Sequence, residues 1–275
     1  MRNLKRTLSL ALASVMLVGM MSVGASAVNA SDFTDADEIV NKDAVSTMTA
    51  LGIINGKEDG SYFDPTGNVT RAEMAKMLCV AINGGVDPVL GVKDTPTFTD
   101  IKGTWAESYI EYCAANGIIA GRGNNKFDPT GTVSATEAAK MLLGVLGYNA
   151  EKSGLVGNDW AINTNVLANQ NGLYKKLSNL NATPLLTRDN AAQMIYNTLD
   201  AYIMEKTFDK VLSNGEISYS YKLSETKTMM SEKFGVVKVE GVVTENEFTE
   251  GSALKGKTTM TVTNGDAGST KGEQS

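Results

Sequence analysis

Apolar side chains recur at helical spacing between residues 31 and 200. In residues 37–51 they fall at i, i+4, i+8 and i+11, which is one face of a helix. That face consists of Val40, Ala44, Met48 and Leu51. Glycine follows this predicted helix and two similar ones, where a helix commonly closes with a left-handed residue. These glycines are Gly52, Gly117 and Gly172.

A second kind of helix is predicted to follow each of the first. Thr70-x-x-Glu73 and Ser134-x-x-Glu137 are capping boxes, in which the hydroxyl and the glutamate satisfy backbone N–H groups at a helix start. Each box precedes an apolar stripe at helical spacing. Before each box stands Asp-Pro-Thr-Gly, in which proline presets its own φ and glycine accepts a positive φ. The pattern predicts helix–loop–helix units and a mainly α fold.

The same unit recurs along the chain. Phe-Thr-Asp, Gly-Ile-Ile-x-Gly and Phe-Asp-Pro-Thr-Gly occur in this order in residues 33–67 and again in residues 98–131. A third copy is more divergent: Thr187-Arg188 stands where Thr70-Arg71 stood, and "NLNATPLL" replaces the Phe-Asp-Pro segment. One helix pair cannot bury its own stripe, so the units should share a core. We call residues 28–86, 94–150 and 155–204 repeats one, two and three.

The remaining segments have a different character. Residues 1–27 are typical of a secretory signal peptide, with a basic start, an apolar run and Ala25-Ser26-Ala27 as a cleavage site; a retained membrane anchor is the alternative. Residues 201–212 are predicted to extend the last helix. Residues 217–223, 234–243 and 257–263 favour β-strands. We expect residues 213–275 to be a small β region with a disordered tail, and the chain to be a piece of a longer surface protein.

The composition of the chain excludes or disfavours several classes of function. The chain has a net charge of −6, and its leader contributes only basic residues, so general nucleic-acid binding is disfavoured. It contains no histidine, which excludes Ser-His-Asp and Cys-His catalysis and the commonest zinc sites, whereas paired-carboxylate chemistry stays open. Cys79 and Cys113 lie on apolar helix faces, where buried free thiols are favoured over a disulfide.

The repeated Phe-Thr-Asp, Gly-Ile-Ile-x-Gly, Phe-Asp-Pro and Thr-Arg-Ala-Glu segments, in a chain with a secretory leader, resemble the S-layer homology domain. The resemblance covers about residues 31–200. It implies a pseudo-threefold helical bundle that holds an exported protein on the bacterial cell wall without a covalent bond. It also implies a secondary cell-wall polysaccharide as ligand, often carrying pyruvate ketals, in grooves between the repeats. Neither a cofactor nor a metal site is expected.

Arg71 is the first candidate for contact with such a ligand. A ketal carboxylate suits an arginine fork and the free N–H groups of a helix start. A solvated arginine, or one paired with Asp64, is the alternative. Arg188 keeps the arginine in repeat three, but Ala135 replaces it in repeat two although the capping box remains. We therefore expect the fold not to need this arginine, and the groove of repeat two to be weak or mainly structural.

The other candidates have structural alternatives. Glu73 already serves a capping box, the two lysines can be solvated, the two aspartates can cap a helix or close a turn, and the tryptophan can pack between repeats or against a sugar ring. These candidates are Glu73, Lys76, Lys140, Asp35, Asp100 and Trp105.

Other functions remain to be weighed. The anchor could belong to a cell-surface glycoside hydrolase; the clustered Glu245, Glu247 and Glu250 lie in a predicted solvated turn. Residues 33–38 and 57–64 offer oxygen ligands for calcium but lack the spacing of an EF-hand. Peptidoglycan and self-assembly in an S-layer are further candidate interactions, and membrane insertion after signal cleavage is not expected.

Overall fold

The computed structural model describes residues 28–177, 185–236, 241–246 and 258–262. The predicted signal peptide and the predicted disordered tail lie outside the described residues. The chain forms two compact units, of which Gly24–Gly235 holds all three repeats. Along the described residues, no helix combines the length and the apolar character that crossing a membrane requires.

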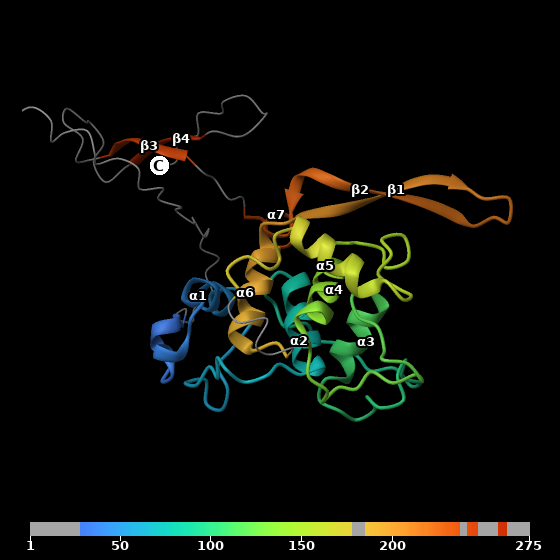
Figure 1. The fold of residues 1–275 in the computed structure, drawn as a ribbon, viewed down its shortest axis with the longest axis horizontal. Helices are drawn as coiled ribbons and strands as arrows, with labels where there is room; N and C mark the ends of the chain where they lie inside the picture. Colours follow the sequence, from blue (N-terminus) through green and yellow to red (C-terminus); the bar gives the residue numbers. More distant parts are fainter. Residues whose placement is uncertain (1–27, 178–184, 237–240, 247–257, 263–275) are drawn as a thin grey trace, which may run out of the picture. The chain divides into compact units, whose positions relative to one another are not determined.

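Two helices come from each repeat, as the apolar pattern predicted (Figure 1). Each second helix packs against the first helix of the next repeat: α2 against α3, α4 against α5, and α6 against α1. The packing is therefore cyclic, and the mainly α fold is confirmed. The helices are α1 Lys42–Ala50, α2 Arg71–Ile82, α3 Glu107–Ala115, α4 Ala135–Val145, α5 Trp160–Gln170 and α6 Arg188–Leu199.

A ring of three backbone hydrogen bonds marks the centre of this arrangement. The Val69 N–H donates to the Leu186 carbonyl at 2.9 Å, Leu186 N–H to Val133 carbonyl at 2.8 Å, and Val133 N–H to Val69 carbonyl at 3.0 Å. All three side chains are fully buried. Each residue stands just before the capping residue of a second helix, so the ring places the starts of α2, α4 and α6 around one pseudo-threefold axis.

The first helix is shorter than its apolar spacing predicted. Residues 36–38 form a separate 3-10 helix, α1 begins at Lys42, and Val40 is 69% exposed. The cause is a long-range contact. Asp189 of α6 accepts hydrogen bonds from the Asn41 N–H at 3.0 Å and from its amide Nδ2 at 2.6 Å, which fixes the chain just before α1.

The turn in Asp-Pro-Thr-Gly also differs from the prediction. Its left-handed residue is the aspartate, since Asp64 and Asp128 both have φ of 61°, and Gly67 and Gly131 have no positive φ. These glycines are required for space instead. A Cβ on either glycine would lie 2.1 Å from a carboxylate oxygen of the aspartate. The glycines that close the first helices do have positive φ, between 70° and 71°, as predicted.

The segment after α6 is a hairpin rather than a helical extension. Strand β1, Tyr202–Val211, pairs antiparallel with β2, Ile217–Thr228, and the Met204 N–H also donates to the Leu146 carbonyl at the end of α4. This non-local pairing outweighs the local preference that suggested a helix. Phe234, predicted to begin a strand, ends helix α7, Met229–Phe234.

The second compact unit contains a two-stranded antiparallel sheet. Strand β3, Gly241–Asn246, pairs with β4, Thr258–Val262. Strand β4 lies within the predicted segment 257–263, whereas β3 shares only residues 241–243 with the predicted segment 234–243; the small β region is confirmed. Glu245 lies in β3 and pairs with Thr259, which corrects its placement in a turn; Glu247 and Glu250 lie outside the described residues.

The two cysteines are free and buried, as the sequence favoured. Cys79 lies in α2 and Cys113 in α3, and the Cys113 thiol donates to the Ala75 carbonyl at 3.4 Å. The two side chains belong to the packed contact between these helices.

Candidate functional site

Arg71 reaches out of its own repeat and into repeat two. Its Nε donates to the Phe127 carbonyl at 2.7 Å, its Nη2 donates to the Ala120 carbonyl at 2.7 Å, and its guanidinium lies 4.3 Å from the centroid of the Phe127 ring. The side chain is only 4% exposed. Burial lowers the pKa of Arg71, and the positive charge of Arg122 adds to this effect. The arginine thus joins repeat one to repeat two.

Arg188 makes the same contact between repeat three and repeat one. Its Nε donates to the Phe63 carbonyl at 2.8 Å and its Nη2 to the Asn55 carbonyl at 2.9 Å, with the guanidinium 5.0 Å from the Phe63 ring. It is also buried, and burial lowers its pKa. Both arginines therefore make structural contacts between repeats, a role that the sequence analysis did not predict. Asp64, the alternative partner for Arg71, pairs with Lys57 at 2.5 Å.

The start of α2 offers no free N–H groups of the kind expected for a ligand carboxylate. The Arg71 N–H donates to the Gly131 carbonyl at 2.8 Å and the Ala72 N–H to the Pro129 carbonyl at 3.0 Å. The next N–H, of Glu73, donates to the Thr70 hydroxyl at 3.2 Å. The loop of repeat two therefore occupies the place at which an anion would meet this helix.

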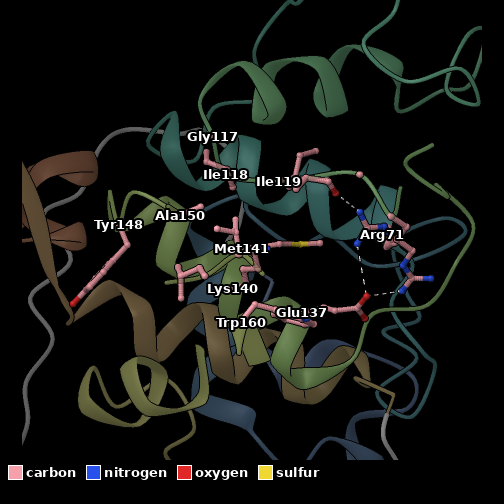
Figure 2. A pocket seen from close by; sticks show the side chains of 16 residues that line it. Arg71, Gly117, Ile118, Ile119, Glu137, Lys140, Met141, Tyr148, Ala150 and Trp160 are labelled. Carbon is pink, nitrogen blue, oxygen red and sulfur yellow. Dashed lines mark hydrogen bonds and ion pairs between the residues drawn. The ribbon is translucent and has the colours of Figure 1, made fainter. Parts of the chain in front are cut away.

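A cavity of about 630 Å³ lies beside Arg71, and we call it the repeat-two groove (Figure 2). Residues from all three repeats line it. Arg71 comes from repeat one, Glu137 and Lys140 from α4 of repeat two, and Trp160 from the first residue of α5 in repeat three. The backbone of residues 117–121 forms a further part of its wall. The arginine of this groove is thus supplied by the neighbouring repeat, so Ala135 does not leave the groove without an arginine, which was the reason for expecting it to be weak.

Charges in the groove are arranged around Glu137. Its carboxylate accepts from Arg122 Nη2 at 2.8 Å and lies 4.0 Å from Arg71 Nη1; Figure 2 shows these contacts as dashed lines. Burial would raise the pKa of Glu137, but hydrogen bonds from the Ser134 N–H and from Arg122 hold it below its usual value. Glu137 is therefore an anion neutralised by two arginines, and the groove keeps an excess of positive charge.

Lys140 supplies that excess. Its Nζ lies 5.1 Å from the centroid of the Trp160 ring, and no carboxylate of the described residues forms an ion pair with it. Burial lowers the pKa of Lys140, and the charge of Arg71 lowers it further. A cation that is partly desolvated and faces another cation is stabilised when an anion binds beside it.

The remaining candidates lie in different surroundings. Asp100 accepts the N–H groups of Phe127 and Asp128, each at 2.8 Å, and Asp35 accepts the equivalent pair in repeat one. Both aspartates therefore hold the Phe-Asp-Pro loop and neither caps a helix. Trp105 is 61% exposed, which contradicts packing between repeats.

Glu73 and Lys76 lie on α2. Glu73 closes its capping box, accepting from the Thr70 N–H at 2.7 Å. Lys76 pairs with Asp87 at 3.3 Å. The sequence reasoning missed Arg122, which follows the Gly-Ile-Ile-x-Gly segment and pairs with Asp128 at 2.7 Å as well as with Glu137. The sequence did contain a sign that Arg122 matters, because Lys57 stands at the equivalent position of repeat one and both repeats therefore have a cation there.

Comparison with known proteins agrees with the repeat pattern. The model of the S-layer homology domain matches residues 32–75 and 97–139. An S-layer protein of Bacillus licheniformis is 26% identical over 68% of this chain, and S-layer protein EA1 of Bacillus anthracis is 32% identical over 38% of it. Exoglucanase XynX of Acetivibrio thermocellus is 29% identical over 54% of it. The matches span 22%, 12% and 14% of these relatives, respectively.

The family match confirms the resemblance for the first two repeats and indicates a secreted protein of the cell surface. Repeat three lies outside the matched residues, although its helices complete the same cyclic packing. Residues 32–75 and 97–139 of this chain are S-layer homology repeats.

Proposed function

We propose that the three repeats anchor the protein to the bacterial cell wall by binding an acidic secondary cell-wall polysaccharide in the repeat-two groove. The observation that carries this proposal is Lys140, a cation in a 630 Å³ groove that no carboxylate of the described residues neutralises. The family match supports the anchoring role, because S-layer homology repeats are found in cell-surface proteins.

The chemistry of the groove suits a sugar that carries a carboxylate, such as a pyruvate ketal. The Lys140 ammonium can donate to the carboxylate, and Arg71 adds positive potential behind it although its own donors are mostly engaged. Trp160 can offer its ring face to the sugar, and Glu137 can accept from a hydroxyl. Arg71 acts as a positioning residue in this account, since it holds the loop that forms one wall of the groove, and Arg188 holds the equivalent loop of repeat one.

Glycoside hydrolases provide a second candidate for the whole protein. The exoglucanase of Acetivibrio thermocellus and an endo-1,4-beta-xylanase A of Thermoanaerobacterium saccharolyticum match 54% and 50% of this chain. In this alternative the repeats still anchor, and a catalytic part accompanies them. The repeats themselves are proposed to be non-enzymatic.

Co-sedimentation with purified cell walls tests the proposal. The full chain is mixed with walls before and after chemical removal of the secondary polysaccharide. We expect binding to intact walls only, and Lys140→Gln to weaken it about tenfold or more, because a hydrogen bond to a charged group contributes about 1.5–3 kcal/mol. Lys102→Gln removes an exposed lysine of the same repeat outside the groove and is the matched control.

Two results would contradict the proposal. Equal sedimentation with stripped walls would identify peptidoglycan as the ligand. Equal affinities of Lys140→Gln and Lys102→Gln would place the binding site outside the repeat-two groove.

A further inference from the structure

Lys76 and Lys140 occupy the same position in two repeats but have different neighbours. Both lie in the sequence Ala-Lys-Met-Leu, three residues after the glutamate of the capping box. Both also lie near an aromatic ring: Lys76 Nζ is 5.4 Å from the Tyr109 centroid, and Lys140 Nζ is 5.1 Å from the Trp160 centroid. Each aromatic residue comes from the first helix of the next repeat.

The surroundings of Lys76 repeat those of the repeat-two groove. Arg188 holds the loop of repeat one through Asn55 and Phe63, as Arg71 holds the loop of repeat two. Glu73 corresponds to Glu137 as the glutamate of the capping box. We call this set of residues the repeat-one site.

The two sites differ in one carboxylate. Asp87 Oδ2 lies 3.3 Å from Lys76 Nζ, and Asp87 Oδ1 accepts from the Tyr109 hydroxyl at 2.8 Å. Burial, followed by this hydrogen bond to Asp87, raises the pKa of Tyr109 to about 12. Asp87 therefore bridges the lysine and the aromatic residue, which are the two groups that a sugar carboxylate and its ring would contact.

Repeat two has alanine at the equivalent place. The hydrogen bond that closes α2 joins the Gly85 N–H to the Val80 carbonyl, and its counterpart after α4 joins Tyr148 to Leu143. Asp87 stands two residues after Gly85, and Ala150 stands two residues after Tyr148. Ala150 lines the repeat-two groove (Figure 2).

We propose that Asp87 is an internal competitor for the anionic group of the ligand, so that it blocks the repeat-one site while Ala150 leaves the repeat-two groove open. This inference rests on the proposed function. An acidic ligand at the repeat-one site must displace Asp87 from Lys76 and then tolerate a second negative charge nearby. Both members of this pair are partly exposed, at 39% and 48%, so the pair is weak enough to be exchanged.

Exchanging the residues between the two sites tests the inference in both directions. The probe is a synthetic methyl glycoside that carries a 4,6-pyruvate ketal, and titration calorimetry on the full chain gives the number of sites and their affinities. Asp87→Asn should add a second site that Lys76→Gln removes. Asp94→Asn, which removes an exposed carboxylate at the start of repeat two, is the charge-matched control and should leave one site.

The reverse change should close the open groove. We expect Ala150→Asp to weaken binding of the probe about fivefold or more, and Ala150→Asn, which has nearly the same size without the charge, to weaken it less than twofold. Thermal unfolding of each variant controls for loss of the fold.

The outcomes separate this inference from the proposed function. If the unmodified chain binds the probe through Lys140 but Asp87→Asn adds no site and Ala150→Asp matches Ala150→Asn, only the role of Asp87 is refuted. If neither the unmodified chain nor Asp87→Asn binds the probe, the acidic-ligand function is refuted together with it.

Discussion

Removing the Arg71 guanidinium should destabilise the whole bundle, because it joins two repeats. Arg71→Ala deletes two hydrogen bonds to the carbonyls of Phe127 and Ala120 and the contact with the Phe127 ring. Hydrogen bonds from a charged group contribute about 1.5–3 kcal/mol each, and a cation–π contact about 0.5–2 kcal/mol. The alanine variant also avoids the desolvation cost of the buried guanidinium, and this gain offsets part of the lost free energy.

We expect a net loss of about 3–5 kcal/mol in the free energy of unfolding. This is near the lower end of the summed contributions of the two hydrogen bonds and the ring contact, because water can reach the part-buried Ala120 carbonyl in the variant. For a domain of this size, about 2–4 °C of melting temperature corresponds to 1 kcal/mol, so the midpoint should fall by about 6–20 °C. Arg71→Lys should recover little, since an ammonium cannot bond to two carbonyls in the geometry of the fork.

Urea unfolding measures this loss, and hydrogen exchange shows where it acts. The amides of residues 117–131 in repeat two should lose more protection in Arg71→Ala than those of residues 52–67 in repeat one. Arg122→Ala is the control, because that arginine is 36% exposed and should cost about 1 kcal/mol or less. A loss below 1 kcal/mol in Arg71→Ala, or exchange that increases only in repeat one, would refute the cross-repeat account.

Two further changes test the local interactions. Ser134→Ala removes the hydroxyl that caps α4 and should cost about 1 kcal/mol in urea unfolding, whereas Ser134→Thr should cost little; equal losses would contradict the cap. Burial would raise the pKa of Asp100, but the N–H groups of Phe127 and Asp128 hold it below its usual value. The stabilisation from Asp100 is therefore full above the unfolded-state pKa of about 4 and disappears as the pH falls through the lower folded-state pKa. Urea unfolding from pH 6 to pH 2 should show a smaller loss of stability for Asp100→Asn than for the unmodified chain, and parallel curves would argue against this role.

Local chemistry explains which parts of the fold the sequence could predict. The capping boxes at Thr70 and Ser134 and the closing Gly52 depend on contacts within a few residues, and each lies where it was expected. The start of α1 was mispredicted because it depends on Asp189, which is distant in the sequence. Strand β1 was mispredicted for the same kind of reason, since its partner is β2.

In the candidate site, too, the features that depend on distant contacts could not be predicted from the sequence. Lys140 was already a candidate in the sequence, but only the packing of α4 against α5 reveals that it faces Trp160 without a carboxylate partner among the described residues. The sequence alone did not show that Asp87 and Ala150 occupy equivalent positions, because α2 and α4 differ in length by one residue. The equivalence follows only from the backbone hydrogen bonds that close the two helices.

The cyclic packing also explains why Ala135 replaces the arginine. Each arginine contacts the phenylalanine of the Phe-Asp-Pro segment in the following repeat, so Arg71 requires Phe127 and Arg188 requires Phe63. In that order, the partner of position 135 is repeat three, which is the repeat whose sequence lacks Phe-Asp-Pro. The segment that replaces it, residues 179–186, contains no phenylalanine, so its sequence offers no equivalent ring to an arginine at position 135. The arginine and the Phe-Asp-Pro sequence are therefore absent together, as the two sides of one contact, and the repeat-two groove keeps the arginine that repeat one supplies, Arg71.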